Sequence, residues 1–412
     1  MPGSATTFRV PRLLLTATLG LAAAASPAAA APAPTPADLR TFASAHYHIH
    51  TDLDRRQTVP FGRHMDLLFK QYERRFRRLG GVNNPEMPLY LLSTEDRYQR
   101  FMRHLGVPAQ NSGGMFFVTR RDRGVATWAN GRSRTLTRRT LQHEGFHQFA
   151  HDHFGDRLPA WTNEGLAQYF GDAILLDRGF ELGLADPDRM LLVRRALETD
   201  TALPLSALLD LGGDDWHRTL TNDHRRAGLL YAQAWSVVYY LIHGDHAAHQ
   251  PKFELYLKLL GEGFHHAQAF PRAFGDDPAA LERGWKRWAR QQLPDAVTVA
   301  AARLSFLGDA LAYKASRGEP MPDDLADLQH DLTQRGFALT RTVYELELEL
   351  RGDQPELYTY TRPGGEATRF LWLEPSRRGL PPRLAAVGLT PEPTLEWERD
   401  GAGELTYDIV YR

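Results

Sequence analysis

The chain of 412 residues contains no cysteine, and this absence restricts its chemistry. Without thiols the protein can form no disulfide bond, use no cysteine nucleophile and bind no metal through thiolate. Any metal ion would have to be bound by carboxylates or by some of the 17 histidines. The search for a site therefore turns to clusters of His, Asp and Glu.

The sequence also lacks an excess of charge of either sign. Its 49 Lys and Arg nearly balance 50 Asp and Glu, which argues against a protein that binds nucleic acid or a membrane surface through a basic patch. A hydrophobic fraction of 42% with 10% aromatic residues argues against wholesale disorder. We therefore expect a globular protein with no nucleic-acid partner.

The clearest apolar run lies near the N-terminus and is short. Arg9 and Arg12 precede it, it extends from Leu13 to Ala25, and the small residues Ala28 to Ala30 follow. This order is typical of a secretory signal peptide, and the run is shorter than the roughly 20 residues that a spanning helix needs. The alternative is a short membrane anchor. We expect cleavage after residue 30, a secreted or periplasmic protein, and no stable membrane span in the mature chain.

The remaining sequence predicts an α+β fold. After a Pro/Ala-rich linker at residues 31–44, strand-like and helix-like patterns alternate, with a strand at 45–51 and an amphipathic helix at 64–79. Helical patterns then dominate to about residue 289, and period-two patterns return after residue 340. We expect a mixed α/β part and a helical part within residues 45–297, followed at 298–412 by a helix and a small antiparallel β module.

The stretch from Leu141 to His151 carries the strongest signal for a site. His143 and His147 lie four residues apart on a predicted helix, so both imidazoles face the same side and can bind one metal ion. Glu144 would lie beside a water activated by that metal and could act as its general base. The alternative is a helix whose histidines are ordinary surface residues, and a third ligand would decide between the two.

Two residues compete for the third ligand position, and they imply different enzyme classes. His153 lies ten residues after the first histidine, as in metzincins, but Ala150 stands where that pattern needs glycine, and no Met-turn follows. Glu164 enters a second predicted helix, capped by Thr162 or Asn163, and would complete a His₂Glu set with an open fourth position. Glu164 could instead only stabilise the helix dipole. We favour Glu164 as the ligand.

Three stretches of the sequence resemble a known group of enzymes. They are His143 to Gln148, Trp161 to Phe170, and Tyr231 to Leu241. Together they resemble the gluzincin metallopeptidases, and among these the exported bacterial proteins with a peptidase-MA-like domain. The resemblance covers roughly residues 45–290 and implies a zincin-like mixed α/β subdomain, a helical subdomain and a cleft between them.

The resemblance also implies roles for individual residues. It implies that His143, His147 and Glu164 bind Zn²⁺, that Glu144 is the catalytic base, and that the substrate is a peptide or protein. Gluzincins are similar in placing a tyrosine on a later helix as hydrogen-bond donor to the oxyanion, and Tyr231 fits that place. Its neighbours equally suit a buried core helix, so a packing role for Tyr231 stays open.

Two further features follow from the same resemblance. Where the family often has an acid four residues after the ligand Glu, this chain has Gln168, and Asp172 is an alternative partner for the first histidine. The segment from Ser112 to Phe117 is expected to form the edge strand above the metal, to which a peptide could add as a further strand. A glycine-containing turn before an inner strand is the alternative for this segment.

The sequence thus favours an exported zinc metallopeptidase of gluzincin type. An alternative from another class is a non-catalytic envelope or binding protein that retains a peptidase fold, although Glu144 favours the enzyme. A zinc hydrolase that acts on a non-peptide amide would use the same ligands, and the sequence does not separate it from a peptidase.

Overall fold

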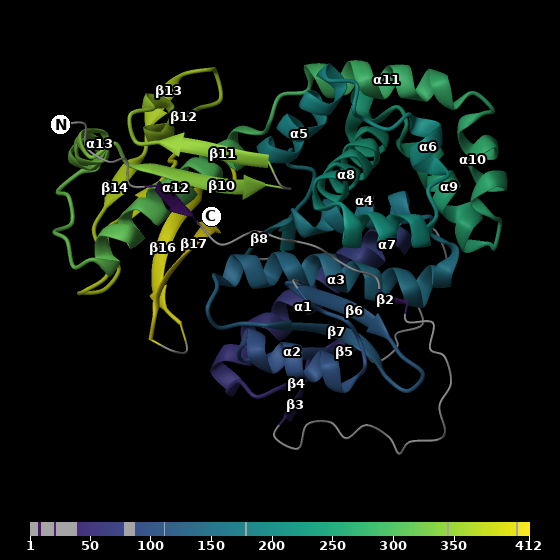
Figure 1. The fold of residues 1–412 in the computed structure, drawn as a ribbon, viewed down its shortest axis with the longest axis horizontal. Coiled ribbons are helices and arrows are strands. Elements are labelled where there is room, and N and C mark those ends of the chain that lie inside the picture. The colour runs from purple at the N-terminus through teal and green to yellow at the C-terminus, as the bar shows by residue number, and fades with distance from the viewer. Residues whose placement is uncertain are drawn as a thin grey trace.

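The protein has an α+β fold with three parts, shown by a computed structural model that describes residues 7–9, 20–21, 39–77, 87–110, 112–177, 179–343, 346–400 and 403–412. A mixed sheet with its helices, a helical part and a C-terminal β module are all visible in Figure 1. The predicted fold class is therefore confirmed. Most of the expected signal peptide and linker lies outside the described residues, and these two assignments stay predictions.

The strands are distributed between the first and the last part of the chain. They are β1 (Thr7–Arg9), β2 (Gly20–Leu21), β3 (Arg40–Ala43), β4 (Tyr47–Thr51), β5 (Met87–Leu92), β6 (Gly114–Val118), β7 (Arg123–Trp128), β8 (Ile174–Leu176), β9 (Gly179–Glu181), β10 (Ala338–Val343), β11 (Leu346–Arg351), β12 (Thr359–Thr361), β13 (Ala367–Arg369), β14 (Leu371–Leu373), β15 (Arg383–Ala385), β16 (Pro393–Arg399) and β17 (Leu405–Tyr411).

The helices dominate the middle of the chain. They are α1 (Arg55–Phe76), α2 (Glu95–His104), α3 (Arg134–Phe154), α4 (Ala160–Gly171), α5 (Pro187–Glu198), α6 (Leu205–Leu209), α7 (Gly213–Asn222), α8 (His224–Ala247), α9 (Gln250–Gly261), α10 (His266–Phe274), α11 (Pro278–Gln291), α12 (Ala296–Ser316) and α13 (Leu325–Gln334), with short 3₁₀ turns at Gly155–Arg157 and Pro355–Tyr358.

The N-terminal sheet has the strand order β2-β6-β7-β5-β4-β3 and is covered on both faces. Alternate side chains of β5 separate into two cores, because successive residues of a strand point to opposite faces. Leu89 and Leu91 join the core that contains residues of α1 and α3, whereas Tyr90 and Leu92 join the core with α2. One face of the sheet thus packs against α3, the helix that carries the paired histidines.

Helix α1 begins nine residues earlier than the sequence analysis predicts, so the expected start at residue 64 is wrong. Asp54 accepts a hydrogen bond from the backbone N–H of Gln57, whose side chain reaches back to the Asp54 backbone. This capping box satisfies N–H groups of the first turn and starts the helix at Arg55. Pro60 lies in the second turn, where it cannot donate to the carbonyl oxygen of Arg56, and the helix continues through it.

The helical part is centred on α4 and α8, which are buried along almost their whole length. A Cβ atom added to Gly165 of α4 would lie 2.7 Å from the backbone oxygen of Ala234 in α8, so glycine permits this close approach. The short antiparallel hairpin β8–β9 interrupts the part that the sequence predicts as almost entirely helical. The two central helices are therefore packed tightly at the position of the candidate ligand Glu164.

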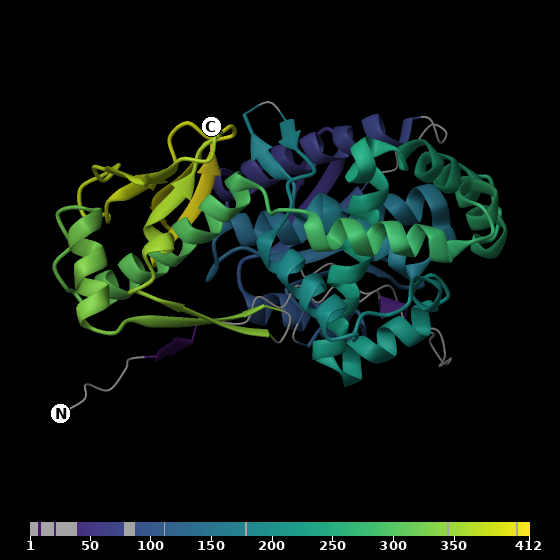
Figure 2. The same cartoon turned by 90° about the horizontal axis from the view of Figure 1, so that it is seen from above.

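The C-terminal module has its own core, built on helix α12. Ala300, Leu304 and Leu311 of α12 pack with residues of the four-stranded sheet β14-β15-β16-β17. By length and composition, α12 could cross a membrane, and no other helix among the described residues could. Its inner face, however, lies in the core of this module. Seen from above, the module forms one end of the elongated molecule (Figure 2).

The module contacts the start of α3 through charged side chains. Asp408 of β17 accepts a hydrogen bond of 2.9 Å from the backbone N–H of Thr135, and Glu398 of β16 pairs with Arg134 at 2.8 Å. The first N–H groups of a helix have no partner within the helix and carry a partial positive charge. Asp408 therefore stabilises the N-terminus of α3 from a strand 273 residues away in the sequence.

We expect Asp408→Ala to lower the free energy of unfolding by about 1–2 kcal/mol, because it removes a buried acceptor and a favourable charge from this helix start. Chemical denaturation, monitored by circular dichroism, measures the change in the free energy of unfolding. Lys258→Ala is the control, since Lys258 is half exposed and pairs with Glu262 only at the surface, so its effect should stay within about 0.5 kcal/mol. Equal effects of the two substitutions would contradict the assigned role of Asp408.

Candidate metal centre

Helix α3 places two imidazoles next to each other inside the protein. His143 and His147 lie on consecutive turns and are 0% and 2% exposed. Their Nε2 atoms are 3.1 Å apart. The spacing of four residues therefore brings both rings to one side of the helix, and these histidines are not surface residues.

Helix α4 delivers a carboxylate to the same point. Glu164 is 2% exposed, and its Oε2 atom lies 3.6 Å from Nε2 of His143 and 3.4 Å from Nε2 of His147. The predicted cap is wrong: α4 begins at Ala160 after Pro159, which makes no side-chain cap, so Glu164 lies beyond the first turn. The position of Glu164 is therefore set by the packing of α4 and not by a role at the helix start.

The distances between these three side chains are more consistent with binding of one shared metal ion than with hydrogen bonds between the side chains. The contacts to Glu164 are longer than an ordinary N–H···O bond of about 2.9 Å, and Oε2 of Glu164 has no hydrogen-bond partner although it is buried. A triangle with sides of 3.1, 3.4 and 3.6 Å has a circumscribed radius of about 2.0 Å, the length of a metal–imidazole bond. The group can therefore hold a metal ion.

A neighbouring amide orients one of the two imidazoles. Nδ1 of His147 lies 3.1 Å from Oδ1 of Asn163. With the amide oxygen as acceptor, Nδ1 carries a proton, and Nε2 is the atom that faces His143 and Glu164. The sequence analysis considered Asn163 only as a helix cap; its position directly before Glu164 was the available signal.

Burial and mutual charge shift the pKa values of the three groups in different directions. Burial lowers the pKa of His143 to about 4. Burial would also lower the pKa of His147, but the attraction of Glu164 outweighs it and raises the value to about 9. At Glu164 burial acts upward, and the two histidines outweigh it and lower the pKa. His147 and Glu164 are thus an ion pair, in which a divalent cation could replace the proton.

Glu144 lies beside this group without being part of it. Its Oε2 atom accepts a hydrogen bond of 2.7 Å from the backbone N–H of Phe116 in β6, and burial raises its pKa to about 8. The segment predicted as the strand above the metal is therefore in contact with the residue predicted as catalytic base. Strand β6 pairs with β7 on one side and with the two residues of β2, which belong to the expected signal peptide, on the other.

Tyr231 of α8 also lies at the site. Its ring centroid is 6.5 Å from that of His143 and 5.6 Å from that of Trp216, and the residue is 1% exposed. His153 lies elsewhere: it stacks on Phe149 and does not belong to the group of converging ligand atoms found among the described residues. The structure thus brings Tyr231 close to His143 and leaves the metzincin-like histidine outside the group of candidate ligands.

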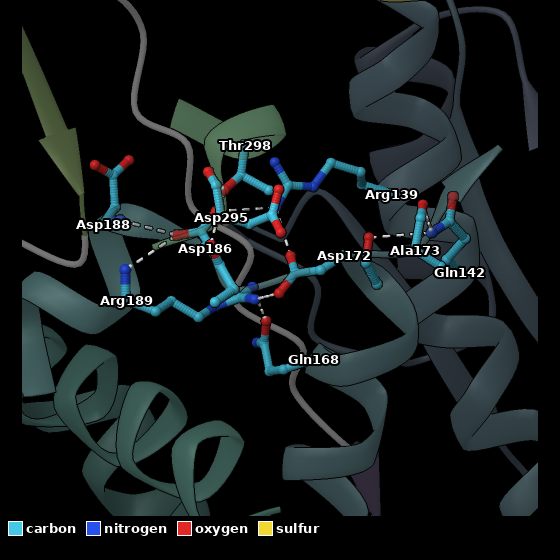
Figure 3. A network of polar contacts seen from close by, with 12 residues as sticks. Arg139, Gln142, Gln168, Asp172, Ala173, Asp186, Asp188, Arg189, Asp295 and Thr298 are labelled. Atoms are coloured by element: carbon cyan, nitrogen blue, oxygen red, sulfur yellow. Dashed lines mark hydrogen bonds and ion pairs between the residues drawn. The ribbon is translucent and has the colours of Figure 1, made fainter. Parts of the chain in front are cut away.

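The two residues considered as partners of His143 are engaged with arginines instead. Asp172 pairs with Arg139 and Arg189, and Gln168 accepts a hydrogen bond from Arg189 (Figure 3). Nδ1 of His143 has no hydrogen-bond partner among the described residues. The sequence analysis missed both arginines, because nothing in the local pattern distinguishes them from surface residues.

Comparison with known proteins finds one family-level similarity, over part of the chain, and no activity. The profile of the family DUF1570, described as a protein of unknown function, matches residues 138–253. No curated protein matches the chain. The matched segment contains all five candidate residues, from His143 to Tyr231, so the family match and the buried site coincide.

We expect the purified protein, equilibrated with first-row divalent ions, to retain one metal ion per chain. His143→Ala and Glu164→Ala should each remove it, because an open site with three protein ligands loses most of its affinity when one is deleted. His153→Ala is the matched control on the same helix and should keep full occupancy. Elemental analysis of the desalted variants tests this, and an empty site in His153→Ala together with a full one in Glu164→Ala would contradict the assignment.

Proposed function

We propose that the protein is a zinc-dependent peptidase of gluzincin type. The observation that carries the proposal is the convergence of two imidazoles from one helix and one carboxylate from the next, with a second carboxylate, Glu144, beside them. Three protein ligands leave one position open, which is typical of catalytic and not of structural zinc. The earlier resemblance to gluzincins supports the same conclusion.

The residues present suit zinc better than a harder cation. His143, His147 and Glu164 would hold the ion with two nitrogen donors and one oxygen donor, whereas Mg²⁺ and Ca²⁺ prefer sites made of oxygen alone. When bound, zinc supplies Lewis acidity and lowers the pKa of a coordinated water to about 7. Asn163 keeps the imidazole of His147 in the tautomer that such binding needs.

Glu144 is the proton carrier of the proposed reaction. It directly follows His143 on α3, and its carboxylate reaches the backbone of β6, so it lies between the ligand group and the strand. From there it can take a proton from the attacking water and deliver it to the leaving amine. This transfer leaves one peptide carboxyl group and one amine as products.

Strand β6 supports a peptide as the substrate. Removal of the expected signal peptide would take β2 away and leave β6 as the outer strand of the sheet. A peptide can then add to this edge through main-chain hydrogen bonds, which position its amide groups without selecting a sequence. The backbone N–H of Phe116, now bonded to Glu144, lies at this edge.

Tyr231 is the proposed donor to the oxyanion that forms when water attacks the carbonyl carbon. It comes from α8, outside the helix pair that supplies the ligands, and its ring lies near His143. A phenol hydroxyl held in this way stabilises charge that develops only during the reaction.

Glu144→Gln tests the proton carrier. The amide has the same shape but cannot accept the proton, so kcat should fall by about 10²–10⁴ while metal content stays that of the wild type. Peptide cleavage and elemental analysis on the same preparation check both expectations. Unchanged hydrolysis would rule out the general-base role, and loss of the metal would instead make Glu144 a ligand.

Tyr231→Phe tests the oxyanion donor. Removal of one such donor typically lowers kcat by about 10²–10³ with little change in KM. The competing packing role predicts nearly normal kcat and a loss of stability of about 1 kcal/mol. Steady-state kinetics and thermal unfolding of the same variant decide: a stable protein with normal kcat would remove Tyr231 from the proposed mechanism.

A further inference from the structure

A buried cluster of charges lies where the two ligand helices meet α5. Arg189 of α5 is 3% exposed, and its guanidinium pairs with Asp172 and donates to Oε1 of Gln168. Asp172 also accepts a hydrogen bond of 2.6 Å from Arg139. Figure 3 shows Asp172 between the two arginines, with Gln168 next to the guanidinium of Arg189.

Three of the four members of this cluster lie close in sequence to a candidate metal ligand, and Arg189 joins them from α5. Arg139 precedes His143 by four residues on α3, and Gln168 follows Glu164 by four residues on α4. Residues four apart lie on the same side of a helix. Asp172 directly follows the last residue of α4. The cluster therefore connects the two helices whose relative position sets the distances between the ligands.

A second set of contacts at the same junction also joins α3 to α4. Nε2 of Gln142, the residue before His143, lies 2.8 Å from the backbone oxygen of Phe170 and 3.1 Å from that of Gly171. These carbonyls belong to the end of α4, which Gln142 thereby joins to α3. Asp172 is the next residue after Gly171. The ion pairs of Asp172 and the amide contacts of Gln142 therefore fix the same short segment, residues 170–172.

The cluster also sets the charge behind the site. It places guanidinium groups about one helical turn from the ligands: Arg139 precedes His143 by four residues, and Arg189 donates to Gln168, which follows Glu164 by four. Loss of negative charge beside these guanidiniums would increase their repulsion of a divalent cation, and the low dielectric of the interior would strengthen this effect. Asp172 is the carboxylate that pairs with both.

We propose that Asp172 and Arg189 are positioning residues of the metal centre, which hold α4 against α3 and keep the charge behind the ligands balanced. The proposal rests on the zinc site proposed above and adds residues that do not touch the metal. At other metal sites, removal of residues that hydrogen-bond the ligands typically costs about 10–100-fold in metal affinity, which sets the scale of the effect expected here.

The test compares zinc affinity and thermal stability in a set of variants. Asp172→Asn should raise the Kd for zinc, measured by competition with a chromophoric chelator, by about 10–100-fold, because it removes the carboxylate that both guanidiniums share. Arg189→Met in the Asp172→Asn background removes one of these charges and should recover part of the affinity. The melting temperatures of the same variants separate the two roles: if Asp172 only contributes to folding, stability recovers while zinc affinity never changes in the folded protein.

Lys314→Met is the matched control. Lys314 is 4% exposed and pairs with Asp331 at 2.7 Å in the C-terminal module, so its loss also breaks a buried ion pair. It should lower the melting temperature and leave the Kd for zinc within about twofold of the wild type. If Asp172→Asn does not fold, Arg189→Lys, which keeps the charge but loses the planar fork, provides the same comparison, with a Kd for zinc that is expected to exceed that of the wild type.

The outcomes separate this inference from the proposed function. If the wild-type protein binds no zinc, the proposed zinc site fails and the inference fails with it. If the wild type binds zinc and the folded Asp172→Asn variant, or Arg189→Lys in its place, binds it equally well, only the inference is overturned. An equal loss of affinity in Lys314→Met would also overturn it, because the effect would then report general destabilisation.

Discussion

The structure depends on the burial of one ionised carboxylate between two imidazoles. Glu164 is almost fully enclosed, and its Oε2 atom receives no hydrogen bond. A charge in this position is costly unless an opposite charge compensates it. Protonated His147 provides one such charge, and a divalent cation at the centre of the three donor atoms would provide a larger one. These buried groups could therefore hold a metal ion.

Helix α3 must stay fixed for this arrangement to persist, and three parts of the chain hold it. The N-terminal sheet packs along one side, α4 and its polar junction along another, and the C-terminal module binds its first turn through Asp408. The module is thus joined directly to the helix that carries the site. This contact gives the β module a physical role within the fold, whatever else it binds.

The sequence predicts the local part of the site and misses the part that depends on tertiary packing. His143 and His147 could be paired because helix periodicity alone brings residues four apart together. The capping box of Asp54 and Gln57 was also readable and would have moved the predicted start of α1 to its observed place. Arg189 and Asp408 could not be assigned, since their partners lie on other elements far along the chain. The β8–β9 hairpin could not be predicted, because strands of three residues are too short to show the two-residue alternation of a β-strand.

The most direct test of a metal-dependent peptidase is digestion of an unbiased peptide mixture by the purified mature protein in ¹⁸O-labelled water, analysed by mass spectrometry. The account predicts new peptide ends that carry ¹⁸O in their carboxyl groups, as hydrolysis by water requires, with cleavage lost after chelation and restored by zinc. Zinc-loaded protein that leaves every peptide intact, or cleavage that persists after complete removal of the metal, would contradict it.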